Sequence, residues 1–414
     1  MIFDGKQVTH LTHDSRDVRE GSLFFSLRGT YVTEALAKGA VGVVTEDARR
    51  QMALISKEFY DNACDKMKIV GITGTNGKTT TTHIISHILR ANKIKVESIG
   101  TLGPTPLTTP DPIELHALFK QFYEEGVQVV VMECSAHAIH LEKLAGITFE
   151  VGVFTNLSQD HLDFFPDYRA YADTKTKWFD ENMKSAVINI DDEESTNIHH
   201  KNIIPYSFDE KIKFRSPLLG RFNHYNCLAA IKVCQQLGLP MRKIKRALRT
   251  VPPVPGRFST VTVNGKTVVV DYAHTPDSLE NIIKACRDLA GDKGHIITVF
   301  GCGGERDVSK RPLMGAVSSQ LSDYTIITSD NPRGEPPRSI MLQIEAGAKL
   351  HSANYKLIAD RKEAIYHALD MAKPGDIVIV AGKGAEDYMD IGGKKISYSD
   401  HGVICEYKSK FDKQ

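Results

Sequence analysis

A glycine-rich segment, GITGTNGKTTT at residues 71–81, carries the strongest chemical signal in the chain. It lies between an apolar run and an amphipathic stretch, which predicts a loop that joins a strand to a helix. Backbone N–H groups of such a loop point at phosphate oxygens. The spacing from Gly71 to Lys78 is one residue longer than in the standard phosphate loop, and Gly74 restores a shorter loop. We expect a nucleotide site, usable by a kinase, a hydrolase or a ligase, rather than an ordinary glycine-rich turn.

Side chains in and near this loop could handle a nucleoside triphosphate and its metal. Lys78 would lie against the β- and γ-phosphates, and Thr79 would bind Mg²⁺. Glu133 ends the apolar run VQVVVMEC, and a carboxylate at the carboxyl edge of a parallel sheet suits a hard cation. A solvated glutamate at a strand end is the alternative. The predicted ATP-binding loop consists of Gly74, Thr75, Asn76, Gly77, Lys78, Thr79 and Thr80.

Strand-like and helix-like stretches alternate along most of the chain, and they must position these groups. Apolar runs such as MKIVGITG, ITFEVGVFTN, AVINID, HIITVFG, YTIITSD and DIVIVAG are separated by amphipathic stretches. This alternation predicts βαβ units with parallel sheets, and therefore the α/β fold class. The dipeptide Asn264-Gly265 inside TVTVNGKTVVVDY predicts a β-hairpin.

The length and composition limit both the domain number and the partners. A single core stops growing at roughly 250–300 residues, so 414 residues predict two or three domains. The change of pattern at Met67 and the cluster Pro252–Gly256 indicate three, at residues 1–66, 67–253 and 254–414. A net charge of +1 argues against bulk attraction to nucleic acid or membrane. Seven cysteines without a CxxC pair, and no visible signal peptide or transmembrane run, predict reduced thiols in a cytoplasmic protein.

A series of further motifs follows the phosphate loop in a fixed order. They are MECSAH, TNLSQDHLD, LGRFNHYNCLAA, DYAHTPDSL, GCGGERDVSKRP, SDNPRGEPP and AGKGAEDY. Together with TGTNGKTT, this series resembles the motifs of the Mur ligases and the related folylpolyglutamate synthetases, from about residue 60 to residue 388. The resemblance implies three domains. On this pattern a small, here shortened, α/β N-terminal domain would bind UDP. A central P-loop ATPase-like domain would have a parallel sheet, and a C-terminal Rossmann-like α/β domain would bind an amino acid. It also implies an ATP-dependent ligase that forms an acyl phosphate and passes it to an amine.

The last three motifs resemble the branch of the family that adds meso-diaminopimelate to the D-glutamate of UDP-N-acetylmuramoyl-L-Ala-D-Glu in peptidoglycan biosynthesis. Arg333, in SDNPR, has a planar fork suited to a carboxylate. Lysine-adding members usually lack this arginine, because lysine has no second carboxylate. Glu386 would receive the distant ammonium group. The implied amino-acid-binding residues are Arg306, Asp330, Asn331, Pro332, Arg333, Gly382 and Glu386.

The resemblance also implies the catalytic and metal-binding residues. Two Mg²⁺ ions would be held by Thr79, Glu133, His161 and Lys175, the last as a carbamate formed from CO₂ or bicarbonate. The family spacing from HLD selects Lys175 and not Lys177. The implied catalytic set is Lys78, Glu133, His161 and Lys175, and Asn226, Arg257 and Asp271 would contact adenine, phosphate and ribose.

The chain departs from the family pattern where the UDP-linked substrate would bind. The N-terminal segment lacks the usual DGH-x-F stretch after its strand, and Leu141 and Lys143 stand where glutamine and arginine are common. The implied substrate residues are Ser15, Arg16, Thr108, Thr109, Ser135 and Lys143. These departures affect the expected binding of the UDP-linked substrate more than the expected ligase reaction.

Two alternatives to diaminopimelate addition stay open. One is a Mur-like ligase for another acceptor, such as a pseudomurein-type peptide or a glutamate chain. The DNPR motif and the start Ser15-Arg16 count against folate. The other alternative is an inactive regulatory paralog, which has no reason to keep the catalytic set together. We expect small-molecule substrates, no nucleic acid, no membrane insertion and a monomer.

Overall fold

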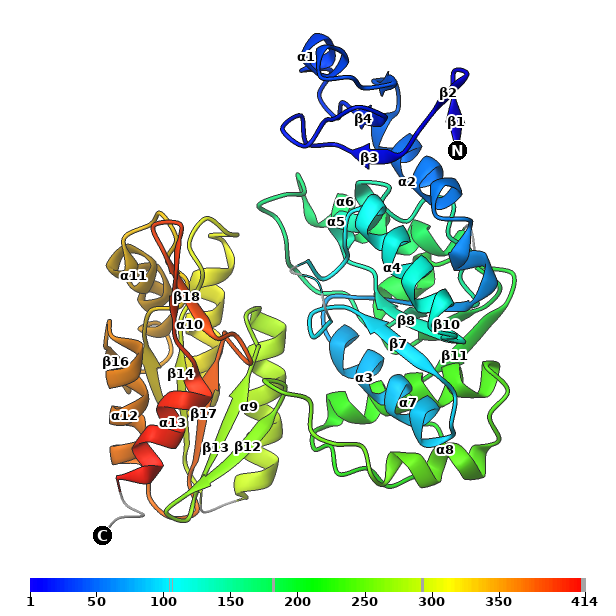
Figure 1. Ribbon diagram of the computed structural model, residues 1–414. Coiled ribbons are helices and arrows are strands. Elements are labelled where there is room, and N and C mark those ends of the chain that lie inside the picture. Colours follow the sequence, from blue (N-terminus) through cyan, green and yellow to red (C-terminus); the bar gives the residue numbers. More distant parts are fainter. Residues whose placement is uncertain (104, 106, 181–182, 292–293, 411–414) are drawn as a thin grey trace. The chain divides into compact units, whose positions relative to one another are not determined.

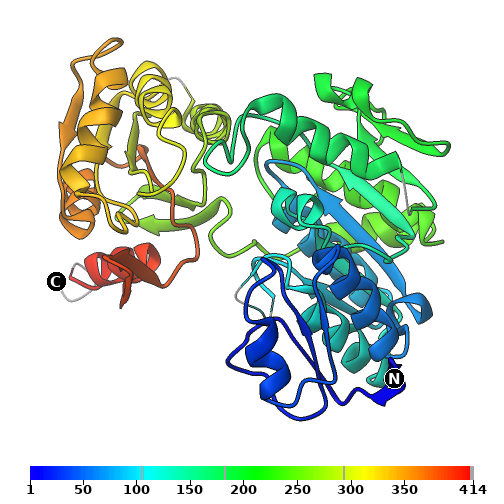
Figure 2. The same ribbon diagram turned by 90° about the horizontal axis from the view of Figure 1, so that it is seen from above.

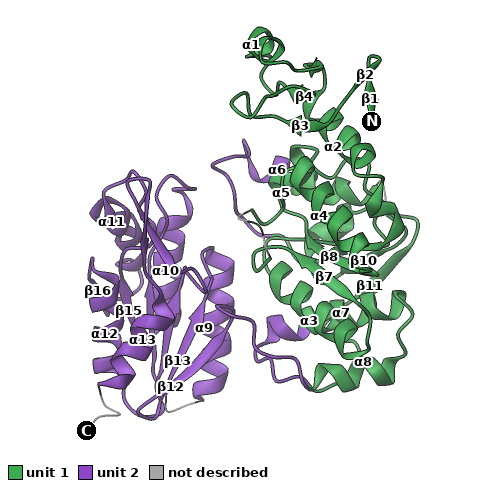
Figure 3. Cartoon of the chain, viewed as in Figure 1, with its two compact units in different colours: residues 1–157, 172–215, 225–249 green, residues 158–171, 216–224, 250–414 purple. Residues whose placement is uncertain are grey.

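The structure is a computed structural model, and it describes residues 1–103, 105, 107–180, 183–291 and 294–410. The chain divides into two compact units (Figure 3). Unit 1 contains residues 1–157, 172–215 and 225–249, and unit 2 contains residues 158–171, 216–224 and 250–414. Unit 1 keeps residues 1–66 together with residues that follow them, so the domain boundaries at residues 66 and 253 stay predictions.

A six-stranded sheet forms the centre of unit 1 (Figure 1). All of its neighbouring strands are parallel, in the order β11-β10-β9-β6-β8-β7. Its strands are β6 (Lys68–Thr73), β7 (Val96–Ile99), β8 (Val129–Glu133), β9 (Val151–Phe154), β10 (Ala186–Asn189) and β11 (Ile203–Tyr206). Strands β8, β9 and β10 are buried along their whole length, as expected for parallel strands covered on both faces. The prediction of a parallel α/β sheet is confirmed.

Among the described residues, four helices connect these strands, namely α3 (Lys78–Ala91), α4 (Pro112–Glu124), α5 (Ala136–His140) and α6 (Tyr168–Thr176). Helices α7 (Arg221–Gln236) and α8 (Met241–Leu248) follow the last strand, β11. Helix α3 begins at the end of the glycine-rich loop and buries Ile84, Ile85, Ile88 and Leu89. Those residues follow the i, i+1, i+4, i+5 spacing of one helix face, so packing holds the start of α3 in place.

The N-terminal segment has its own small sheet. Strands β3 (His10–Thr12), β4 (Ser22–Phe25) and β5 (Gly42–Val44) pair in parallel, and β1 (Ile2–Phe3) pairs with β2 (Lys6–Gln7). Helices α1 (Val32–Ala37) and α2 (Ala48–Phe59) follow β4 and β5. Leu23 and Phe25 of β4 pack with Met52 of α2 in one cluster. The segment is therefore a short βαβα unit with a core of its own.

The sheet of unit 2 has the order β12-β13-β17-β14-β15-β16, and only β12 and β13 are antiparallel. Its strands are β12 (Ser259–Val263), β13 (Lys266–Asp271), β14 (Ile296–Phe300), β15 (Tyr324–Ile327), β16 (Tyr355–Leu357) and β17 (Ile377–Ala381). The predicted hairpin is confirmed, because Asn264 and Gly265 join β12 to β13 with φ of 49° and 75°. A second hairpin, of β18 (Tyr388–Ile391) and β19 (Lys394–Ser397), follows β17.

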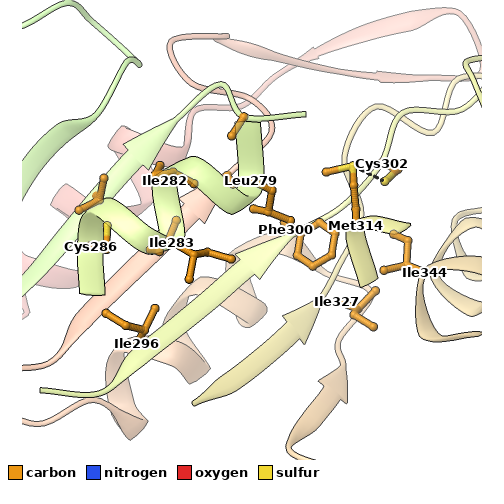
Figure 4. Packing of buried hydrophobic residues seen from close by; sticks show 14 of the residues in the cluster. Leu279, Ile282, Ile283, Cys286, Ile296, Phe300, Cys302, Met314, Ile327 and Ile344 are labelled. Carbon is orange, nitrogen blue, oxygen red and sulfur yellow. Dashed lines mark hydrogen bonds between the residues drawn. The ribbon is translucent and has the colours of Figure 1, made fainter. Parts of the chain in front are cut away.

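Helices cover both faces of this sheet (Figure 2). They are α9 (Pro276–Ala290), α10 (Lys310–Leu321), α11 (Pro337–Ala348), α12 (Arg361–Met371) and α13 (Asp400–Ser409). Ile296 and Phe300 of β14 pack with α9, α10 and α11 (Figure 4), whereas Ile297 and Val299 pack with α12 and α13. This alternation is the period of two of a strand buried on both sides. The two layers fix the ends of β14, β15 and β17, from which the loops of the site emerge.

Two composition-based predictions can be compared with the structure. Cys405 is exposed, whereas the other six cysteines, all within the described ranges, are buried and form no disulfide with one another. No helix in the described ranges has both the length and the apolar character needed to cross a bilayer.

Candidate active site

The glycine-rich segment forms a tight loop between β6 and α3. Gly77, directly before α3, has a φ of 85°, and a Cβ there would lie 2.5 Å from Asn226 Oδ1. Gly74 has a φ of 146°, and its Cβ would lie 1.9 Å from Thr155 Oγ1. Lys78 Nζ donates hydrogen bonds to the carbonyl oxygens of Gly74 and Thr75, each at 2.9 Å. The loop therefore curls around its own lysine, and glycine is required at both turns.

The structure brings two of the predicted metal ligands together. Thr79 Oγ1 donates to Glu133 Oε2 at 3.1 Å, and the carboxylate is almost completely buried. The N–H group of Thr101 donates to Glu133 Oε1 at 2.9 Å. A Cβ on Gly100 would lie 2.3 Å from that same oxygen, so glycine leaves room for the carboxylate. This group of a carboxylate and threonine hydroxyls offers only hard oxygen donors, which fits Mg²⁺.

The other two predicted metal ligands, His161 and Lys175, belong to different units. Lys175 lies in α6 with only 2% of its surface exposed, in unit 1, whereas His161 belongs to unit 2. Among the described residues, no group of three or more His, Cys, Asp or Glu side chains is arranged to hold a metal ion. The structure thus groups Thr79 with Glu133, and the roles of His161 and Lys175 stay predictions.

Asp160 lies close to three basic side chains in unit 2, and the sequence analysis did not single it out. Its carboxylate lies 3.4 Å from His161 Nε2, 3.7 Å from His274 Nε2 and 3.9 Å from Lys310 Nζ. Burial raises the pKa of Asp160, but the hydrogen bond from His274 and the electrostatic effect of His274, His161 and Lys310 outweigh burial and hold the pKa well below its usual range. His161 itself has a φ of 59°, a left-handed backbone that non-glycine residues rarely adopt. Asp160 therefore fixes the histidine that the sequence singled out.

The nucleotide residues predicted outside the loop lie in both units. Thr81 Oγ1 of α3 donates to Asn226 Oδ1 of α7 at 3.2 Å, which places Asn226 beside the loop. In unit 2, the carboxylate oxygens of Asp271 accept N–H groups of Phe258 and Ala273 at 2.6 and 2.7 Å. Burial raises the pKa of Asp271, and the Arg257 charge opposes that rise. Arg257 stacks over the Tyr272 ring at 4.3 Å, so Arg257 and Asp271 share one neighbourhood.

Most of the residues predicted to bind the amino acid form a cluster at the ends of β15 and β17 in unit 2. Asn331 Nδ2 donates to Glu386 Oε2 at 2.9 Å, and a Cβ on Gly382 would lie 2.5 Å from Asp330 Oδ2. Pro332 is buried next to Asn331. These residues follow the carboxyl ends of β15 and β17, two strands of one sheet that are separated by β14. Ligands of open α/β sheets commonly bind outside the carboxyl ends of the strands.

The two predicted arginines lie on either side of one glycine. A Cβ on Gly303 would lie 2.8 Å from Arg333 Nη1 and 3.7 Å from Arg306 Cγ. Arg333 Nη1 donates to the carbonyl oxygen of Gly304 at 2.6 Å, whereas the Arg306 guanidinium lies 3.4 Å from Asp163 Oδ2. The structure therefore brings Arg306 near Arg333, but the guanidinium group of Arg306 is paired with Asp163.

A buried arginine that was not predicted ties these loops together. Arg311 donates to both carboxylate oxygens of Glu335, at 2.8 and 2.9 Å, and to the carbonyl oxygen of Gly303 at 3.1 Å. The hydrogen bonds from Arg311 lower the pKa of Glu335 to about 2. The loop after β14 is thereby bonded to the loop after β15.

The Glu335–Arg311 pair predicts a pH dependence of stability. Because the folded-state pKa lies below the ordinary glutamate value of 4.5, the stabilisation is complete above pH 4.5 and is lost as pH falls toward 2. We expect Glu335→Gln to reduce the loss of thermal stability of unit 2 between pH 5 and pH 3. Melting temperatures of both proteins over that range measure the difference. Equal slopes for the two proteins would contradict the assignment.

The predicted substrate residues divide into two sets. Beside the central sheet of unit 1, Thr109 Oγ1 donates to Ser135 Oγ at 3.2 Å and to the Glu133 carbonyl oxygen at 2.8 Å. Thr108 Oγ1 lies 3.4 Å from Thr101 Oγ1, so both threonines lie near Glu133. Lys143 Nζ pairs with Asp111 Oδ1 at 2.8 Å. In the N-terminal segment, the exposed Arg16 is bonded to Asp14 and Lys38 donates to the Ser15 carbonyl oxygen.

Comparisons with known proteins agree with this architecture. Residues 72–212 match the Mur ligase middle domain, and residues 256–384 match the Mur ligase, glutamate ligase domain. The chain belongs to the Mur ligase family. Its β6–α3 loop lies in the matched middle domain, and the Asn331–Glu386 region begins in the matched glutamate ligase domain and ends two residues beyond it. The prediction of a Mur ligase architecture with N-terminal, middle and C-terminal domains is confirmed, and this Mur ligase is an ATP-dependent acid–amino-acid ligase.

Individual members of the family are similar over nearly the whole chain. UDP-N-acetylmuramoyl-L-alanyl-D-glutamate–2,6-diaminopimelate ligase of Geobacillus kaustophilus is 40% identical over 460 residues, which cover 96% of this chain and 94% of that protein. The ligase of the same name from Caldanaerobacter subterraneus subsp. tengcongensis is 39% identical over 464 residues, covering 98% and 96%. A solved structure with that name has a TM-score of 0.68 and 29% identity, and covers 100% of this chain and 98% of its own. The aligned lengths exceed 414 residues, so both relatives contain residues that this Mur ligase lacks.

Proposed function

We propose that this Mur ligase adds meso-diaminopimelate to the D-glutamate of UDP-N-acetylmuramoyl-L-Ala-D-Glu in peptidoglycan biosynthesis. The observation that carries the proposal is the cluster of Asn331, Arg333 and Glu386 at the ends of β15 and β17. It offers a guanidinium for a carboxylate and a carboxylate for an ammonium group. Relatives of that name at 39–40% identity support the same substrate. We expect the enzyme to act in the cytoplasm, and its cysteines, which form no disulfide, fit that compartment.

The chemistry follows from charge. A carboxylate that attacks the γ-phosphoryl group of ATP approaches a polyanion, so cationic groups must offset the repulsion. Lys78 and the N-terminus of α3 would bind the β- and γ-phosphates. Thr79, Glu133, His161 and carbamylated Lys175 would hold two Mg²⁺ ions, which when bound neutralise charge on the transferred group.

The second half of the reaction depends on the amino-acid cluster. The amine of the incoming amino acid attacks the acyl carbon of the acyl phosphate on the acceptor. The amide C–N bond forms as the C–O bond to phosphate breaks, and inorganic phosphate and a proton from the amine are released. Arg306 and Arg333 would hold carboxylates of that amino acid, and Glu386 would hold its distant ammonium. Fixing both ends lowers the entropic cost of bringing the amine to the acyl carbon.

The amino-acid assignment predicts a selective defect in Arg333→Ala. We expect kcat/KM for meso-diaminopimelate to fall about 10- to 100-fold, because hydrogen bonds to a charged group are lost. The KM for ATP should stay unchanged, since Arg333 lies outside the phosphate loop. Steady-state ADP release measures both quantities. Arg338→Ala is the matched control, because Arg338 is an exposed arginine five residues away. An equal loss in the two variants would contradict the role of Arg333.

The carbamate assignment predicts a spectroscopic signal. With ¹³C-bicarbonate, the wild type should show a carbamate resonance that Lys175→Ala lacks and Lys177→Ala retains. Lys177 is a suitable control because its side chain is 69% exposed and pairs with Asp173 in the same region. Activity should fall about 100-fold or more in Lys175→Ala only. A resonance that persists in Lys175→Ala would refute this assignment.

The acceptor is tested by a substrate panel. ADP release is measured with UDP-muramoyl-dipeptide, a pseudomurein-type peptide and a glutamate chain, each with several amino acids. We expect turnover only with UDP-muramoyl-dipeptide and meso-diaminopimelate. Several acceptors are compared because Lys143 stands where arginine is common in the family, and its ammonium group is paired with Asp111. Turnover with another acceptor would replace the proposal by a ligase of different specificity.

A further inference from the structure

Lys383 is a fully buried lysine between two residues that were assigned to the amino-acid site. It follows β17 and has no exposed surface. Its Nζ donates to Asn331 Oδ1 at 3.0 Å and to Glu386 Oε2 at 2.9 Å. An ammonium group out of water is costly unless it is both paired and hydrogen-bonded. These two contacts are therefore what keeps Lys383 in this position.

The backbone around Lys383 makes the burial possible. Gly382 and Gly384, on its two sides, have φ values of 112° and 56°. A Cβ on Gly384 would lie 2.7 Å from the carbonyl oxygen of Gly256, so the chain passes close to another segment there. The two left-handed turns are accessible to glycine at little cost. They place the lysine side chain inside the cluster instead of in solvent.

The hydrogen bonds of the cluster can be counted atom by atom. Asn331 Oδ1 accepts from Lys383 Nζ and from the N–H group of Asp390, at 3.0 and 2.9 Å, which uses both of its lone pairs. The amide nitrogen therefore faces Glu386, and donates to Oε2 at 2.9 Å. Within the described part of the chain, Glu386 Oε1 accepts no hydrogen bond, and the second N–H of the Asn331 amide donates none. One acceptor, Glu386 Oε1, and one donor, the second amide N–H of Asn331, therefore have no partner among the described residues.

We propose that Lys383 is a positioning residue that orients Asn331 and Glu386 for the amino-acid substrate. The inference rests on the proposed function, since it concerns the same site. The remaining amide N–H of Asn331 suits a carboxylate, and the remaining Oε1 of Glu386 suits an ammonium group. An amino acid carries both groups. Lys383 also offsets part of the Glu386 charge, so that Oε2 stays with its two donors and Oε1 stays available.

The test uses Lys383→Met, which keeps the length of the side chain and removes its donors. We expect KM for the amino acid to rise about 10- to 100-fold, as for lost hydrogen bonds to charged groups, while KM for ATP stays within about twofold. Lys395→Met is the control, because Lys395 is an exposed lysine over the Tyr388 ring in the adjacent hairpin and should leave both constants unchanged. An unchanged amino-acid KM, or an equal rise in the KM for ATP, would overturn the inference.

A second comparison keeps the inference testable if Lys383→Met fails to fold. The double variant Lys383→Met/Glu386→Gln leaves no unpaired buried charge. If Lys383 acts through Glu386, its amino-acid KM should lie within about twofold of that of Glu386→Gln alone. A further large rise in the double variant would contradict the inference. If the wild type uses an amino acid other than meso-diaminopimelate, the proposed function is refuted but the inference about Lys383 is not. The variants would then be compared with that amino acid as the substrate.

Discussion

Glu133→Gln is expected to lower the rate of ADP formation about 100- to 1,000-fold, the loss typical of removing one preorganised electrostatic group. The carboxylate is 1% exposed and accepts hydrogen bonds from Thr79 and from the Thr101 N–H group. Glutamine has the same shape but lacks the charge that would hold a cation beside the γ-phosphate. The rate is measured at saturating substrates, with thermal unfolding recorded in parallel.

The control for this experiment is Glu97→Gln. Glu97 lies on β7, next to β8, but its side chain is 40% exposed and lies 3.8 Å from Arg90. We expect its rate to equal that of the wild type. If Glu133→Gln kept more than about a third of the wild-type rate, Glu133 would not be the metal-binding carboxylate.

Asp400→Asn is expected to destabilise unit 2 by about 3–5 kcal/mol, the usual cost of breaking a buried ion pair. Arg361 and Asp400 are both 0% exposed and form two hydrogen bonds at 2.8 Å. The same guanidinium donates to the carbonyl oxygens of Ser329 and Ala381, the residues directly before Asp330 and Gly382. Loss of the pair should therefore loosen the amino-acid site as well as the packing of α12 against α13.

The two helices supply their own control. Lys362 and Glu406 also join α12 to α13, but their side chains are 44% and 49% exposed. Because exposed pairs contribute about 0–1 kcal/mol, Glu406→Gln should change the unfolding midpoint little. Urea unfolding of both variants measures the difference. Similar midpoints for Asp400→Asn and Glu406→Gln would show that burial does not decide the strength of this pair.

Local signals explain which parts of the fold were predictable. The phosphate loop is specified within one short segment, because Gly74 and Gly77 are needed where the chain turns and the helix begins directly at Lys78. The hairpin at Asn264-Gly265 has an equally local cause. By contrast, β19 (KKIS) is exposed at all four positions and shows no apolar alternation. A strand of that kind is defined by its neighbour β18 and not by its own residues.

The site shows the same division between local and long-range causes. The motifs indicated Glu133, Asn331 and Glu386, which the structure joins to other predicted residues. Thr101 was missed because its contact with Glu133 joins segments 32 residues apart in the chain. Lys383 was missed although Glu386 is only three residues away, because its bond to Asn331 joins segments 52 residues apart and its burial is not visible in the motif. Arg306 was assigned to the amino acid by its motif, yet its guanidinium pairs with Asp163 from another segment. Spacing within a motif does not reveal such pairings.

The most direct test of the central claim lets two amino acids compete for the same acceptor. The purified protein is incubated with ATP, Mg²⁺, UDP-N-acetylmuramoyl-L-Ala-D-Glu and equal concentrations of meso-diaminopimelate and L-lysine. The mass of the product is then measured by mass spectrometry. We predict a single ligated product with the mass of the diaminopimelate adduct, formed together with ADP. A lysine adduct as the main product, or ADP formation without ligation to the muramoyl-dipeptide, would contradict the claim.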